Sequence, residues 1–340
     1  MPQPRKSQIA IEATPAYHCV SRCVRRAFLC GKDKFTGRSF EHRRGFIESE
    51  LLRLGQVFFL DVMAYAVMSN HFHVVLFIDQ PAQKEATALD IVTRWHQIHQ
   101  GNIVSTKFLN NEALEPPEID QLNLYIDTWS ERLSSISWYM RVLNEKVARL
   151  ANAEDNVTGR FWEGRFKCQA LLDEQALLSC MAYVDLNPVR ATMADTPEQS
   201  DHTSIQRRIK HWQQESEKTQ DTHTQQVQPF QPENLYPFVG HLRQPMPKGI
   251  IFNLVDYLQL VDWTGRQIRE DKVGAISTEA ELILKRLSIS KEHWVYLCTH
   301  FESRFKGRLD VFTRLSELVR YSGGRDDLTW LLARLCILKP

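Results

Sequence analysis

The sequence has 340 residues and carries 42 lysine and arginine residues against 41 aspartate and glutamate residues, so its net charge is close to zero. Apolar residues make up 43% and charged residues 24% of the chain, a balance that excludes global disorder. No run of about 18 apolar residues occurs and no signal peptide is recognisable, so we expect neither a membrane span nor export. Seven scattered cysteines, an odd number, fit a reducing cytoplasm.

Hydrophobic periodicity predicts strands and helices in alternation over the first 200 residues. The expected strands are 17–24, 57–68, 71–78 and 169–172. The expected helices are 40–54, 82–100, 130–151 and one that begins at Asp173 and ends near Pro188. Residues 101–128 contain two adjacent prolines and two adjacent asparagines, which favours a loop. This order predicts an α+β fold, an antiparallel sheet with helices on one face.

A polar, glutamine-rich segment divides the chain in two. We expect a catalytic domain over 1–212, a linker over 213–234 and a helical domain of unassigned role over 235–340. Within the last part, helical patterns cover 251–269, 279–287 and 309–320.

Basic side chains gather in two segments of this nearly neutral chain. Residues 1–56 hold 11 basic and 5 acidic side chains, and a second cluster follows Gly159. Such patches indicate a defined site for a polyanion, although solvated surface charge gives the same pattern. The basic residues that we single out are Arg22, Arg25, Arg26, Arg160, Arg165 and Lys167.

Two histidines are spaced for one face of a strand. His71 and His73 flank Phe72, and the period of two in a strand places both imidazoles on one side and Phe72 on the other. Two such imidazoles can bind one divalent metal ion and leave positions open. They can equally be ordinary histidines of a half-buried strand.

A second segment carries a tyrosine and an asparagine four residues apart. On a helix, Tyr183 and Asn187 would share a face. A tyrosine hydroxyl can act as a covalent nucleophile when its target phosphate is activated by a metal ion. An amide oxygen is a ligand that hard divalent ions accept. Taken alone, the segment is more typical of a half-buried helix tyrosine followed by a residue at a helix end before proline.

Three segments in this order resemble the single-tyrosine HUH transposases, most closely the REP-associated tyrosine transposases. They are His71-Phe72-His73, then Gly159 to Phe166 (GRFWEGRF), then Tyr183 to Ala191 (YVDLNPVRA). The resemblance covers about residues 15–205. Valine stands at position 184, where the family has isoleucine, and residues 100–129 are long for a compact member.

The resemblance implies a ferredoxin-like, RNA-recognition-like sheet and a set of site residues. Tyr183 would be the nucleophile, and His71, His73 and Asn187 would bind Mg²⁺ or Mn²⁺. The reaction would be cleavage and rejoining of single-stranded or hairpin DNA through a 5′-phosphotyrosine. The chain lacks a phosphate-binding GxxxxGK[ST] loop, so we expect no nucleotide cofactor. Candidate DNA-binding residues are Arg22, Arg25, Arg26, Arg160, Trp162, Arg165, Lys167 and Arg190.

Other functions remain open at this point. The chain can be a domesticated, non-catalytic regulator that binds hairpin DNA, or a nuclease that uses water instead of the tyrosine. A replication initiator or relaxase is a further alternative, but those enzymes often have paired tyrosines, and the helix of Tyr183 offers one. The resemblance allows a monomer or a homodimer.

Overall fold

The computed structural model describes residues 9, 13–24, 29–32, 37–219, 231–242, 244–269 and 278–304. It is an α+β structure built on a four-stranded sheet. The strands are β1 (Ala16–Arg22), β2 (Leu60–Val67), β3 (His71–Ile78) and β4 (Lys167–Ala170). All neighbouring pairs are antiparallel, and their spatial order is β2-β3-β1-β4.

This strand order is that of a ferredoxin-like sheet. The order places β3 and β1 in the centre of the sheet. Helix α1 (His42–Val57) connects β1 to β2, and α6 (Ile136–Glu154) precedes β4, as in the ferredoxin-like arrangement of strands and helices. The α+β prediction and the antiparallel sheet are therefore confirmed. The register places Val20 opposite both His73 and Lys167, which gives three neighbouring strands a common row of side chains.

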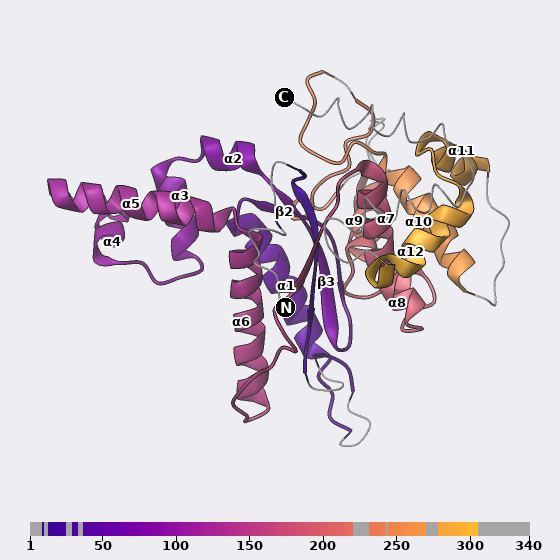
Figure 1. Ribbon diagram of the computed structural model, residues 1–340, viewed down its shortest axis with the longest axis horizontal. Helices are drawn as coiled ribbons and strands as arrows, with labels where there is room; N and C mark the ends of the chain where they lie inside the picture. Colours follow the sequence, from indigo (N-terminus) through magenta and orange to yellow (C-terminus); the bar gives the residue numbers. More distant parts are fainter. Residues whose placement is uncertain are drawn as a thin grey trace.

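The two faces of the sheet support two hydrophobic cores. One face presents Phe72 and Val74 to α1 and α6. The other presents Val75 to a second core that contains Tyr183. Figure 1 shows α1 and α6 on one side of the strands and α7 to α12 on the other. Helices therefore cover both faces of the sheet and not the one face expected from the sequence, because each central strand packs on a separate core on either side. One of those faces carries the two histidines.

Helices follow the sheet on its second side. They are α7 (Glu174–Asp185), α8 (Asn187–Arg190), α9 (Ser204–Thr219), α10 (Leu254–Ile268), α11 (Thr278–Arg286) and α12 (Lys291–Arg304), with a short 3₁₀ turn at Pro197–Gln199. Helix α9 runs into the segment expected to be a linker, and α12 lies where no helix was expected. The predicted helix 309–320 lies outside the described residues. The division into domains stays a prediction.

An arm of four helices projects from the body (Figure 1): α2 (Gln80–Glu85), α3 (Ala88–His96), α4 (Ile103–Leu109) and α5 (Pro116–Leu133). The expected helix 82–100 is divided because Thr87 begins a new helix in a capping box with Asp90. The expected loop 101–128 is wrong. Its two prolines occupy the first turn of α5, where proline costs no hydrogen bond.

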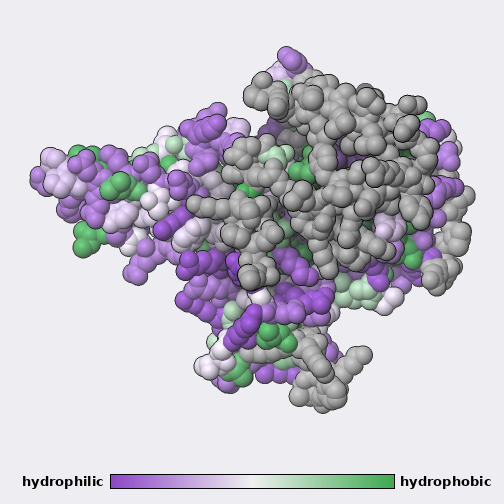
Figure 2. All heavy atoms as spheres, in the orientation of Figure 1, coloured by the Kyte–Doolittle hydropathy of each residue, from purple (hydrophilic) through white to green (hydrophobic). Residues whose placement is uncertain are grey.

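The face of the arm visible in Figure 2 is mainly hydrophilic, with hydrophobic residues scattered singly. Leu124 and Ile103 are among the exposed ones. Scattered apolar side chains of this kind are ordinary on a protein surface. Among the described helices, none is long and apolar enough to cross a membrane.

Candidate functional site

The two histidines of β3 lie side by side on the face that α7 covers. Their ring centroids are 4.8 Å apart, with the planes at 76°. His73 is fully buried and His71 is partly exposed, while Phe72 points into the opposite core. The side-chain alternation expected from the sequence is therefore present.

Tyr183 approaches this pair from α7. Asp173 fixes the start of that helix, because its carboxylate accepts a hydrogen bond from the backbone N–H of Ala176 at 2.7 Å. Ten residues further on, the Tyr183 ring lies 5.7 Å from the His73 ring, nearly perpendicular to it. Tyr183 is only 3% exposed. A residue near the end of α7 thus meets the central strand β3 of the sheet.

Asn187 follows on a separate helix. Helix α7 ends at Asp185 and α8 begins at Asn187, so the expected single helix with Tyr183 and Asn187 on one face is interrupted at Leu186. Arg190 connects the two residues. Its guanidinium carbon lies 4.2 Å from the centroid of the Tyr183 ring, and its Nη1 donates a long 3.5 Å hydrogen bond to Asn187 Oδ1.

A third histidine, His18 of β1, belongs to the same cluster and was missed in the sequence. Its Nε2 lies 3.0 Å from His73 Nδ1, and it is 3% exposed. Nothing local in the sequence connects the two histidines: His18 has the strand parity of Val20, but only the register of β1 with β3 places Val20 opposite His73. That pairing joins residues more than 50 positions apart, so local patterns could not reveal it.

The electrostatic environment favours a neutral His73 and an anionic ligand. Burial lowers the pKa of His73 well below its ordinary value of 6.5, and the neighbouring His71, His18, Arg190 and Arg22 lower it further. Arg22 stands opposite His71 in the β1–β3 register. Two guanidinium groups therefore add positive potential around a neutral imidazole.

The donor atoms fit a divalent cation in part. His73 Nε2 is buried and has no hydrogen-bond partner in the described part of the chain, as expected of a ligand atom. In Asn187 the possible ligand is Oδ1, which accepts the long hydrogen bond from Arg190, because the amide nitrogen carries hydrogens and cannot bind a cation. His71 Nδ1 lies 2.5 Å from Asn70 Oδ1, a carbonyl that accepts, so the proton of a neutral His71 sits on Nδ1 and leaves Nε2 as a lone pair. Among the described residues, no group of three or more His, Cys, Asp or Glu side chains is placed to bind a metal ion. Two imidazoles and an amide remain the available ligands.

Two predicted DNA-binding residues of the loop before β4 form hydrogen bonds to backbone carbonyl groups of the protein itself. Arg160 donates to the backbone carbonyls of Trp162, at 2.7 Å, and Glu163. The indole of Trp162 donates to Asn144 O at 2.8 Å and packs edge-on against Phe72. Arg160 therefore braces the loop itself, and Trp162 holds the loop against α6 and the sheet.

The other predicted DNA-binding residues differ in their placement. Arg165 and Lys167 are exposed on this loop and at the start of β4, and Arg22 is exposed at the end of β1. Arg25 and Arg26 lie outside the described residues.

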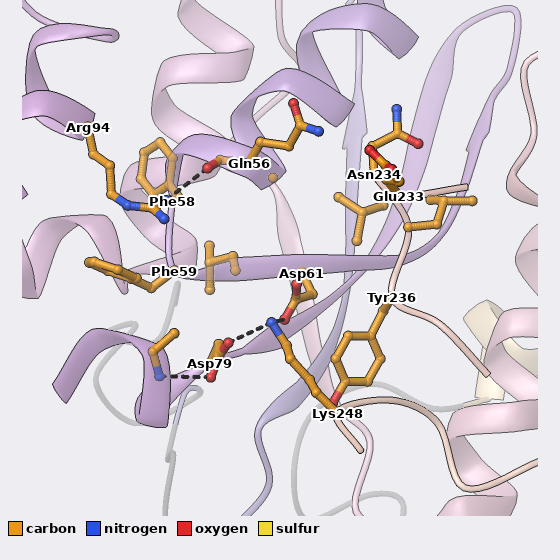
Figure 3. Close-up of a pocket in the computed structure, with 15 residues that line it drawn as sticks. Gln56, Phe58, Phe59, Asp61, Asp79, Arg94, Glu233, Asn234, Tyr236 and Lys248 are labelled. Atoms are coloured by element: carbon orange, nitrogen blue, oxygen red, sulfur yellow. Dashed lines mark hydrogen bonds and ion pairs between the residues drawn. The ribbon is translucent and has the colours of Figure 1, made fainter. Parts of the chain in front are cut away.

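A cavity of about 250 Å³ lies at the other end of β3. Figure 3 shows Lys248 between Asp61 and Asp79, with N–O distances of 2.7 and 2.6 Å. Burial raises the pKa of Asp61, although the Lys248 ammonium opposes that effect. Lys248 pairs with both aspartates of this cavity. Asp79 follows the end of β3, whereas His71 begins it. The cavity is therefore separate from the histidine cluster.

Comparisons with known proteins leave the family open. No protein-family model matches the chain, and no curated protein matches it. A solved structure of a REP-associated tyrosine transposase bound to a REP hairpin is similar with a TM-score of 0.36 and 10% identity, over 62% of this chain and 86% of that chain. Values this low carry no argument about function, so the functional assignment depends on the site.

Proposed function

We propose that the protein is a metal-dependent transposase or endonuclease that cleaves and rejoins single-stranded DNA at hairpin-flanked sites through a 5′-phosphotyrosine. One observation carries this proposal. The Tyr183 ring lies 5.7 Å from the ring of His73, a fully buried histidine whose Nε2 has no partner in the described part of the chain. A buried polar atom without a partner is costly unless a ligand completes it.

The ligands of the ion would be His71, His73 and Asn187. Bound Mg²⁺ or Mn²⁺ would polarise the scissile phosphate and neutralise charge that develops on it. Both imidazoles can present Nε2, since Asn70 engages Nδ1 of His71 and His18 engages Nδ1 of His73. The amide of Asn187 supplies an oxygen of the kind that hard cations accept.

Tyr183 would act as the nucleophile. Its hydroxyl oxygen forms a bond to phosphorus while the bond from phosphorus to the 3′ oxygen breaks. The hydroxyl proton is released, and the leaving oxygen takes up a proton to become a free 3′-OH. The phosphodiester energy is kept in the tyrosine ester, so a second 3′-OH can reverse the step without a nucleotide cofactor.

Arginines around the site would bind the DNA backbone. Arg190 stands over the tyrosine ring, and Arg22 lies across from His71, so both can face a phosphate near the reacting centre. Arg165 and Lys167 are exposed beyond it and suit phosphates of the flanking strand.

A second candidate is a hairpin-binding regulator without catalysis. The observation in its favour is the burial of Tyr183, whose ring is covered by Phe301 of α12 at a centroid distance of 5.8 Å. A tyrosine that stays covered cannot reach a phosphate. This candidate shares the DNA partner and differs only in the chemistry.

Covalent trapping distinguishes the two. The full chain is mixed with Mn²⁺ and labelled single-stranded hairpin oligonucleotides from the DNA that flanks its own gene, and the products are separated on a denaturing gel. The proposal predicts a labelled protein band that is lost in Tyr183→Phe and in the double variant His71→Ala/His73→Ala. A native-gel shift without the covalent band supports the regulator. Cleavage that persists in Tyr183→Phe contradicts the tyrosine mechanism and indicates water as the nucleophile.

A further inference from the structure

His18 and His73 meet through one hydrogen bond between ring nitrogens. His18 Nε2 and His73 Nδ1 are 3.0 Å apart, and the ring planes differ by 7°. The centroid distance of 5.2 Å is that of two rings which meet edge to edge at this hydrogen bond, so the shared proton lies in the plane of both rings. Both side chains are buried, which holds this geometry in place.

Such a contact contains one proton, and its position decides what His73 offers to a ligand. If His18 donates, the proton of His73 sits on Nε2 and leaves a buried N–H without an acceptor in the described part of the chain. If His73 donates from Nδ1, its Nε2 is a lone pair that can bind a cation. The second arrangement matches His71, whose Nδ1 faces the carbonyl oxygen of Asn70.

We propose that His18 is a positioning residue that accepts the Nδ1 proton of His73 and thereby keeps His73 Nε2 unprotonated for the metal ion. The inference depends on the metal site of the proposed function and assigns a role to a residue outside it. Metal-binding histidines commonly donate their second ring nitrogen to an acceptor, which fixes tautomer and ring orientation. A neutral imidazole does this without placing a negative charge beside the phosphate.

Two substitutions separate positioning from packing. His18→Gln places an amide oxygen near the position of Nε2 and retains an acceptor, whereas His18→Met has a similar volume and offers no comparable acceptor. Both variants remove the imidazole, so a purely structural effect should appear in both. Thermal unfolding of each variant tests whether the fold is kept.

The first readout needs neither metal nor DNA. Long-range ¹H–¹⁵N correlation spectra of histidine-labelled, metal-free protein report the tautomer of His73, with its signals assigned from a His73→Gln spectrum. We expect the Nδ1–H tautomer in the wild type and in His18→Gln, and a shift toward Nε2–H in His18→Met. An Nε2–H tautomer in the wild type would overturn the proposal, whatever the activity of the protein.

The second readout is the affinity for Mn²⁺ alone, measured by calorimetry or by the loss of the free-ion paramagnetic resonance signal. We expect His18→Met to weaken binding by about 10- to 100-fold and His18→Gln by only a few-fold. Equal affinity in all three proteins would overturn the positioning role. Absence of Mn²⁺ binding by a wild type with the expected tautomer would contradict the metal site itself, and this proposal with it, so the two failures can be told apart.

Discussion

The ring of Phe301 on α12 lies 5.8 Å from the ring of Tyr183 on α7, at an interplanar angle of 37°. Phe301 also meets His18 edge-on at 6.0 Å, so one side chain covers both the tyrosine and the histidine cluster. In the proposed mechanism, this cover would have to move before a DNA phosphate could reach Tyr183, which is 3% exposed. Helix α12 therefore controls access to the tyrosine and the histidines in this mechanism.

Removal of the Phe301 ring should increase the rate at which Tyr183 reacts. Phe301→Ala deletes a buried aromatic ring, a change that costs about 3–5 kcal/mol in a packed core. If access to Tyr183 requires α12 to move away, the variant populates this open state more than the wild type does. We then expect the initial rate of covalent adduct formation to rise by up to about 100-fold. Gel-based trapping at several time points measures it.

The matched control for this variant is Leu297→Ala. Leu297 is buried on the same helix, and its truncation costs about 2–5 kcal/mol, which loosens α12 while the ring of Phe301 stays. A rate in Phe301→Ala no higher than that of the wild type would show that Phe301 does not restrict access. An equal gain in both variants would assign the effect to the helix rather than to the ring.

Arg190 should be needed for reaction rather than for folding. Its guanidinium lies over Tyr183 and near Asn187, where it can donate to the scissile phosphate. Loss of a charge-assisted hydrogen bond of about 1.5–3 kcal/mol predicts a 10- to 100-fold slower cleavage by Arg190→Gln. Single-turnover cleavage rates measure this, with the exposed Arg149→Gln on α6 as control. Equal rates in the two variants would remove Arg190 from the site.

Arg165 and Arg160 belong to one loop and should respond differently. Arg165 is exposed, and one phosphate contact with single-stranded DNA contributes about 0.7 to the slope of log affinity against log salt. We expect Arg165→Ala to lower that slope by about this amount in a filter-binding titration. Arg160→Ala should instead destabilise the loop, because Arg160 donates to its carbonyl groups. An unchanged slope in Arg165→Ala would exclude it from the DNA-binding surface.

Glu48 should make stability depend on pH. It accepts from Tyr65 Oη at 2.5 Å and pairs with His202 Nδ1 at 2.6 Å, which joins α1, β2 and the residues before α9. Burial raises the pKa of Glu48, but the hydrogen bonds from His202 and Tyr65 outweigh it, and the folded pKa lies below 4.5. The carboxylate therefore stabilises the fold above pH 4.5, and this contribution is lost as pH falls through the folded value.

The corresponding variant is Glu48→Gln. We expect its free energy of unfolding at pH 7 to be about 1–3 kcal/mol lower than that of the wild type, and the difference to shrink below pH 4.5. Urea titrations at a series of pH values test this. Glu145→Gln is the control, because Glu145 forms an exposed pair with Arg149 worth at most about 0.5 kcal/mol. A difference that does not change with pH would contradict the assigned role of the carboxylate.

The sheet and the histidine pair could be predicted because their signals are local. The strand that begins at His71 alternates its side chains within eight residues, and its bounds agree with the structure. The arm was harder to predict. Two adjacent prolines suggested a loop, yet they begin α5, where the capping box between Glu115 and Glu118 was the better guide.

Long-range contacts explain the rest of what the sequence did not reveal. His18 meets His73 only because β1 pairs with β3, and Phe301 covers Tyr183 only because α12 packs on α7. In the aromatic and basic loop the residue types alone could not reveal the structural contacts, since Arg160 donates to carbonyl groups of the loop and Trp162 donates to Asn144 O, while their role in DNA binding stays a prediction.

The most direct test of the central claim locates the covalent bond. The full chain is incubated with Mn²⁺ and the cleaved hairpin oligonucleotide, the adduct is digested with nuclease and protease, and the modified peptide is sequenced by mass spectrometry. We predict a 5′-nucleotide phosphate on Tyr183 and on no other residue, formed only when the metal ion is present. A nucleotide on a different tyrosine, or cleaved DNA with no modified peptide, would contradict Tyr183 as the nucleophile.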